Sequence, residues 1–297
     1  MDLWSYFQSN NGPLINKWKH YFPVYEEHFR PFVNKPLTFL EIGVYHGGSL
    51  QMWKHYFGPH ARIIGIDILP KCKEFEEDQI DIRIGKQQDR KFLQDVLDEF
   101  GPPDIVLDDG SHMMSDMTAS FRYLYPRLTK NGIYVVEDLQ TCYWEEFQGG
   151  LRREGTFIEL CKTLIDELNA EHCRGTLAPT DFTTATLSMH FYDGMAVLKR
   201  GTHTRKAALE IGKKTLRAWD LLPLRLARRF QSKSPSWTSV DGGLPSESGL
   251  YCVRLDDETE SEAHYDLSSQ SWHPAPDPDQ SGKLRVVCWK PGKNRSS

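Results

Sequence analysis

Short apolar runs and helix-like periodicity alternate along the chain from residue 37. The apolar runs read TFLEIG, RIIGIDI, DIRIG, DIVLDD and GIYVVED, at residues 38–43, 62–68, 81–85, 104–109 and 132–138. Between the later runs, apolar residues recur at helical spacing, as in Phe92, Val96 and Phe100. Alternation of this kind predicts an α/β fold in which helices cover both faces of a mostly parallel sheet.

Two further β-rich runs follow a helical stripe that extends from Phe157 to Leu168. They read ATLSMHFYD (185–193) and GMAVLKRG (194–201), and they meet at Asp193 and Gly194. Asp-Gly between two such runs is a strong signal for a hairpin. We therefore predict that the parallel sheet finishes with an antiparallel hairpin.

Pattern and composition divide the chain into four parts. We expect a helical cap, a core, a basic amphipathic linker and a small β domain, at residues 1–36, 37–201, 202–235 and 236–297. The basic stretch at 205–233 is interrupted by Pro223, and it fits either a linker docked on the acidic residues that follow or a helix on an anionic membrane surface. Nucleic-acid binding is disfavoured because the patch is short and the whole chain is acidic.

Composition places the chain among ordinary globular proteins. Hydrophobic residues make up 39% of its 297 residues, the net charge is −5 and the mean hydropathy is −0.54. No apolar run approaches the roughly 18–20 residues needed to cross a bilayer, and the first residues lack the pattern of a secretory signal. The six cysteines include no CxxC pair, which disfavours a zinc knuckle or a redox dithiol. We expect a cytoplasmic protein, with peripheral contact at the inner membrane only if the basic stretch makes it.

A glycine-containing loop joins the first strand to a helix in FLEIGVYHGGSL. Its pattern has Glu41, Gly43, Gly47 and Gly48, which is not the G-x-G-x-x-G of a dinucleotide site. An acid ahead of the first glycine would repel a pyrophosphate, but it suits the cationic amino-acid end of S-adenosylmethionine. Asp67 follows about 20 residues later, where an acid can accept hydrogen bonds from ribose hydroxyls. The alternatives are a tight turn for the glycines and a helix cap for Asp67.

Carboxylates end the fourth and fifth predicted strands, which should be neighbours in the sheet. Asp109 follows one strand, and Glu137 and Asp138 end the other. Carboxylates that converge in a partly dry crevice repel one another unless a cation neutralises them, and oxygen ligands suit magnesium, manganese or calcium. His112 could then remove the proton of a bound hydroxyl. In the alternative interpretation Asp109 is a helix cap, His112 an exposed turn residue and the last two acids a strand terminus.

FLEIGVYHGGSL, IIGIDI, IGKQQD, VLDDGSH and VVEDLQT resemble, in this order and spacing, the class I S-adenosylmethionine-dependent methyltransferases. More narrowly, they resemble the metal-dependent sugar O-methyltransferases of macrolide biosynthesis, the mycinamicin type. The resemblance covers roughly residues 14 to 200 and implies a Rossmann-like methyltransferase fold with a seven-stranded sheet. It implies His112 as the general base, and as metal ligands it implies Asp109, Glu137 and Asp138. As cofactor-binding residues we expect Glu41, Gly43, Gly47, Asp67, Gln87 and Asp109.

The aromatic-rich stretch KWKHYFPVYEEHF (17–29) precedes the first strand. It fits a cap over the cofactor, with Tyr21 or Tyr25 touching it, and it equally fits a helix packed on the sheet. For the C-terminal β unit we assign no catalytic role.

Three functions compete. The first is an O-methyltransferase, dependent on S-adenosylmethionine and Mg²⁺ or another divalent cation, that acts on a sugar hydroxyl of a glycan or glycosylated natural product. The second is a related tailoring enzyme, a hydroxylase or hydrolase, that uses the same crevice. The third is a catalytically silent binding protein. For the first we expect a sugar-containing small molecule or glycan as partner, and a homo-oligomer.

Overall fold

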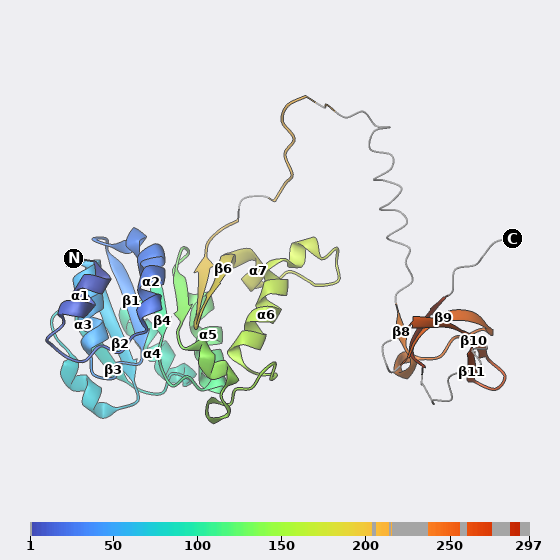
Figure 1. The fold of residues 1–297 in the computed structure, drawn as a ribbon. Helices are drawn as coiled ribbons and strands as arrows, with labels where there is room; N and C mark the ends of the chain where they lie inside the picture. Colours follow the sequence, from blue (N-terminus) through green and yellow to red (C-terminus); the bar gives the residue numbers. More distant parts are fainter. Residues whose placement is uncertain are drawn as a thin grey trace. The chain divides into compact units, whose positions relative to one another are not determined.

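The computed structural model describes residues 2–203, 206–213, 215, 237–255, 260–274 and 286–291. The chain divides into two compact units, Met1–Ala208 and Leu209–Ser297, and each is described by itself (Figure 1). Only 206–213 and 215 of the basic stretch at 205–233 are described, so the prediction of membrane contact falls almost wholly outside the described residues. None of the described helices is long and apolar enough to cross a membrane.

The larger unit is built on a seven-stranded sheet with the strand order β3-β2-β1-β4-β5-β7-β6. Its strands are β1 (Leu37–Ile42), β2 (Ala61–Asp67), β3 (Ile80–Ile84), β4 (Ile105–Asp108), β5 (Ile133–Val136), β6 (Thr186–Tyr192) and β7 (Met195–Arg200). The first five strands pair in parallel, whereas β7 runs antiparallel to β5 and β6. This confirms the predicted mostly parallel sheet with its terminal hairpin.

Helices cover both faces of this sheet, as the alternating pattern predicts (Figure 1). One face buries side chains of α1 (Leu3–Ser9), α2 (Phe22–Phe29) and α3 (Gly48–Phe57). The other buries side chains of α4 (Arg90–Phe100), α5 (Met114–Leu124) and α6 (Phe157–Leu168), and the short α7 (Asp181–Ala185) packs beside α6. Apolar residues on both faces make the sheet the centre of the core.

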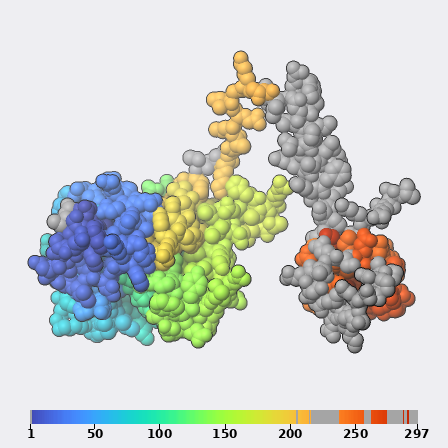
Figure 2. Space-filling view, in the orientation of Figure 1, coloured from blue at the N-terminus to red at the C-terminus, as the bar shows by residue number. Residues whose placement is uncertain are grey.

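Helix α2 packs on the sheet through aromatic side chains. Its Phe29 is fully buried and contacts the rings of Phe39 on β1 and Trp53 on α3. Helix α1 packs against both α2 and α3. Figure 2 shows the dark blue N-terminal residues on the surface of the larger unit. Of the two arrangements considered for residues 17–29, the structure thus shows the packed helix, and a capping role over a cofactor stays a prediction.

Close approach of two strand ends explains one glycine of the loop. Gly43 has a φ of +96°, and a Cβ at this position would lie 2.1 Å from the carbonyl oxygen of Asp109. Gly47 has a φ of +79° and is the N-cap residue of α3. Both positions therefore need glycine for the chain to turn from β1 into α3 while staying next to β4.

The smaller unit contains a five-stranded antiparallel sheet with the order β11-β10-β9-β12-β8. Its strands are β8 (Thr238–Ser239), β9 (Gly249–Leu255), β10 (Glu260–Asp266), β11 (Ser271–Pro274) and β12 (Val286–Pro291). This confirms the separate C-terminal β unit. The boundaries and roles expected for residues 1–36 and 202–235 stay predictions.

Candidate functional site

The register of the sheet brings the predicted acids to one edge. Ile42 of β1 lies beside Asp108 of β4, which in turn lies beside Val136 of β5. Because the strands are parallel, the residues that follow them also become neighbours. Glu41, Asp109 and Glu137, which are far apart in the sequence, therefore meet at the carboxyl edge where ligands bind in open α/β sheets.

A lysine that the sequence analysis missed lies among these acids. The Lys17 Nζ is 3.2 Å from Glu41 Oε1, 2.6 Å from Asp109 Oδ2 and 3.2 Å from Glu137 Oε2. Its side chain is 1% exposed. Burial opposes its charge, but the three carboxylates raise the pKa of Lys17 well above its usual range. Lys17 is therefore an ammonium ion enclosed by acids.

Two of the three acids around Lys17 lie in surroundings that disfavour their charged forms. Burial raises the pKa of Glu41, although Lys17 opposes this and Ser49 and Trp53 donate hydrogen bonds to its carboxylate. Burial also raises the pKa of Glu137, again against Lys17. Both side chains are almost completely buried, so charges interact strongly here, and a cation nearby would favour the charged carboxylates.

Two tyrosines of the 17–29 segment hold the acids that end β5. The Tyr25 hydroxyl donates to Glu137 Oε1, and the Tyr21 hydroxyl donates to Asp138 Oδ1 at 3.0 Å. Both side chains are 1% exposed. These tyrosines therefore place the carboxylates of Glu137 and Asp138, while contact of Tyr21 or Tyr25 with a cofactor stays a prediction.

His112 lies between two acids at the mouth of this cluster. Its Nε2 is 3.7 Å from Asp109 Oδ1 and 3.6 Å from Asp138 Oδ2. Possible ligand atoms of Asp109, His112 and Asp138 all lie within 4.8 Å of one another. His112 and Asp138 have backbone φ angles of +57° and +55°, which residues other than glycine rarely adopt. Such backbone strain is typical of functional sites. Glu137 faces Lys17 and Tyr25 instead, and its role as a metal ligand stays a prediction.

The first aspartate of VLDDGSH differs from the second. Asp108 is buried and accepts hydrogen bonds from Gln87, Ser120 and Tyr134. Burial raises its pKa to about 6, and these donors oppose the rise. Asp108 is therefore a buried, fully partnered group, while Asp109 reaches the cleft.

The glycine loop is anchored by Asp67. Its Oδ2 accepts the backbone N–H groups of Val44 and Tyr45, at 2.8 and 3.1 Å, and its Oδ1 accepts that of Leu69 at 2.8 Å. The structure does not show the helix-cap alternative for Asp67, because Leu69 is the N-cap of the short helix that follows; Asp67 instead fixes the backbone of two loops. The same carboxylate also lines the adjoining clefts, so a ligand role stays a prediction.

Two clefts meet at the glycine loop. The smaller, of about 170 Å³, is lined by Gln87, Gly110 and Ser111, and the larger, of about 500 Å³, by Asp109, His112 and Asp138. Residues Gly43 and Asp67 line both. The Gln87 amide is itself engaged, because its Nε2 donates to Asp108 and its Oε1 accepts the backbone N–H of Ser111. Gly47 lines neither cleft and serves the turn.

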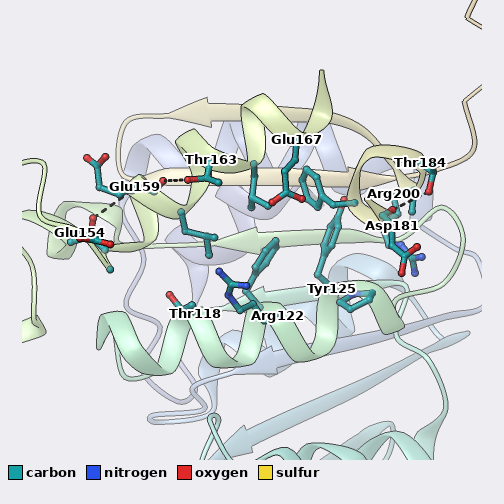
Figure 3. Close-up of a pocket in the computed structure, with 18 residues that line it drawn as sticks. Thr118, Arg122, Tyr125, Glu154, Glu159, Thr163, Glu167, Asp181, Thr184 and Arg200 are labelled. Carbon is teal, nitrogen blue, oxygen red and sulfur yellow. Dashed lines mark hydrogen bonds between the residues drawn. The ribbon is translucent and has the colours of Figure 1, made fainter. Parts of the chain in front are cut away.

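A third cavity lies away from all predicted site residues. It has a volume of about 770 Å³ and opens between α5, α6 and α7, with Arg122, Glu159 and Asp181 among its lining residues (Figure 3). Acidic and basic side chains both surround it, and its floor is apolar. Its size alone does not connect it to the chemistry at the carboxyl edge of the sheet.

Comparison with known proteins agrees with this geometry. The 8-demethyl-8-(2-methoxy-alpha-L-rhamnosyl)-tetracenomycin-C 3'-O-methyltransferase of Streptomyces olivaceus is 39% identical over 199 residues, which cover 63% of this chain and 50% of the relative. The MycE methyltransferase from the mycinamycin biosynthetic pathway, solved with Mg, SAH and mycinamycin VI, superposes with a TM-score of 0.62 at 32% identity, over 75% of this chain and 58% of that chain. The larger unit has the class I methyltransferase fold.

The larger unit resembles the mycinamicin type, as its motifs indicated. The mycinamicin VI 2''-O-methyltransferase of Micromonospora griseorubida is 36% identical over 197 residues, or 61% of this chain and 48% of the relative. No family model matches the chain. The chain spans about half the length of the curated relatives it matches.

Proposed function

We propose that the chain is an S-adenosylmethionine-dependent, divalent-metal-assisted O-methyltransferase that acts on a sugar hydroxyl of a glycan or glycosylated natural product. The observation that carries the proposal is the meeting of two clefts at the glycine loop, with His112 between Asp109 and Asp138 in the larger one. The similarity to sugar O-methyltransferases supports the class of acceptor.

The residues at the cleft fit a hard divalent cation. Asp109 and Asp138 present carboxylate oxygens beside His112, and oxygen ligands are those that Mg²⁺ prefers. Asp109 and Asp138 would hold the metal, and Glu137 is the third predicted ligand.

When bound, S-adenosylmethionine supplies the methyl group and Mg²⁺ lowers the pKa of the acceptor hydroxyl. His112 accepts the proton of that hydroxyl, since its ring is partly exposed, lines the larger cleft and lies beside Asp109 and Asp138. Glu41, which is buried beside Lys17 and lines neither cleft, is the predicted partner of the amino end of the cofactor, and Asp67, which lines both clefts, is the predicted partner of its ribose. Trp18, Tyr45 and Trp144 remain largely exposed around the larger cleft, where aromatic faces can contact an acceptor.

Cofactor binding is tested by calorimetric titration with S-adenosylhomocysteine. We expect the unmodified protein to bind it, and Glu41→Gln and Asp67→Ala to bind it more weakly. Asp78→Asn is the control, because the side chain of this exposed acid makes none of the hydrogen bonds that Glu41 and Asp67 make around the glycine loop. Absence of binding by the folded, unmodified protein would refute the proposed function and favour the tailoring-enzyme or silent-binding alternatives.

Methyl transfer is tested with labelled S-adenosylmethionine and glycosylated acceptors. We expect product with Mg²⁺, loss of product with a chelator, and recovery when Mg²⁺ is returned. Binding of the cofactor without transfer to any sugar acceptor would argue for the hydroxylase or hydrolase alternative. Self-association stays a prediction that size-exclusion chromatography would test. Membrane contact through 205–233 stays a prediction that vesicle sedimentation would test.

A further inference from the structure

The two oxygens of Asp109 face different groups. Its Oδ2 lies 2.6 Å from Lys17 Nζ, while its Oδ1 faces His112 Nε2 at 3.7 Å. The carboxylate is thus held by an ion pair on one side and open to the cleft on the other. A partner on one oxygen fixes the direction in which the other oxygen points.

Lys17 is placed for this contact by buried structure. Ile15 is buried in the sheet core two residues before it, and Tyr21 and Tyr25 follow on the other side. Because the ammonium is also paired with Glu41 and Glu137, three strands contribute acids to one cation. A surface lysine would move between partners, whereas the side chain of Lys17 is 1% exposed and its ammonium is held by three carboxylates at the border of the larger cleft.

We propose that Lys17 is a positioning residue that orients Asp109 for the metal and joins the cofactor acid Glu41 to the metal site. This inference rests on the proposed function, in which Asp109 is a metal ligand and Glu41 binds the cofactor. Carboxylates that ligate metals are commonly held by such outer partners, and loss of one typically weakens metal binding by roughly 10- to 100-fold.

Electrostatics alone would predict the opposite result. An ammonium 2.6 Å from a ligand carboxylate repels a second cation, so its removal would strengthen metal binding if charge were its only effect. The direction of the change therefore separates a positioning role from simple charge competition. A purely structural role would leave the metal affinity of the folded protein unchanged.

The test is calorimetric titration of Mg²⁺ into the full chain saturated with S-adenosylhomocysteine. We expect Lys17→Met to weaken Mg²⁺ binding by about 10- to 100-fold, while binding of S-adenosylhomocysteine without metal is retained because Ser49 and Trp53 still orient Glu41. Lys19→Met is the matched control. It removes a positive charge two residues away, from an exposed side chain that lies over the Trp4 ring.

An unchanged or higher Mg²⁺ affinity in Lys17→Met would overturn the inference. If Lys17→Met does not fold, Lys17→Arg provides the answer, since it keeps the charge but changes the distance to Asp109. We expect Lys17→Arg to weaken Mg²⁺ binding as well, and wild-type affinity in this variant would count against positioning. Failure of the unmodified protein to bind S-adenosylhomocysteine would instead refute the proposed function, so the two failures are distinguishable.

Discussion

The buried His28 predicts that the larger unit loses stability in acid. This residue of α2 is 1% exposed, its Nε2 lies 2.8 Å from the Tyr192 hydroxyl, and its ring contacts that of His190. Burial lowers the pKa of His28 from 6.5 to about 4. Lys199 and His190 act in the same direction, while Glu27 opposes them. The folded protein therefore keeps this ring neutral.

The sign and size follow from proton linkage. The unfolded chain takes up a proton at His28 below about pH 6.5, whereas the folded chain does so only near pH 4. The contribution of the neutral His28 ring to the free energy of unfolding is therefore complete above pH 6.5 and is lost as the pH falls toward 4. At pH 5 the loss is about 2 kcal/mol, which corresponds to roughly 4–8 °C in Tm for a unit of this size.

The assay compares thermal unfolding at pH 7.5 and pH 5 for the unmodified protein and His28→Gln. Glutamine can still hydrogen-bond the Tyr192 hydroxyl but does not titrate. We therefore expect the free energy of unfolding of His28→Gln to fall by about 2 kcal/mol less on acidification than that of the unmodified protein. The exposed His60→Gln serves as the control and should lose as much as the unmodified protein. Equal losses in all three proteins, or a His28 ring that titrates at pH 6.5 or higher by NMR, would refute the reasoning.

Three further predictions concern the site. His112→Asn should lower kcat by about 10²- to 10⁴-fold with cofactor affinity retained, as measured by methyl transfer and calorimetry; a fully active variant would exclude His112 as the base. Gly43→Ala should lower Tm far more than Gly101→Ala, because both positions have positive φ but only Gly43 faces the Asp109 carbonyl, with open space at Gly101. Asp138→Asn should weaken Mg²⁺ binding in calorimetry while leaving S-adenosylhomocysteine binding intact, and equal Mg²⁺ affinity would remove Asp138 from the ligand set.

Local pattern in the sequence was sufficient for most of the fold. Apolar runs such as 104–109 end in polar turns, and the Asp-Gly pair at 193–194 marks the hairpin that the structure contains. Glycines at 43 and 47 predicted the loop, since positive φ and close approach to β4 leave little choice of residue. Such features depend on neighbours in the chain, so they can be recognised before the tertiary structure is known.

Which acids meet, and what neutralises them, was decided only by the tertiary structure. Lys17 is 24, 92 and 120 residues from Glu41, Asp109 and Glu137, and no periodicity links them. Its position in an aromatic-rich segment indicated a packed or capping helix, and gave no signal for an ion pair. Sheet register and the packing of α2 set these distances, because the carboxyl ends of three parallel strands and the segment before α2 meet only once the core has formed.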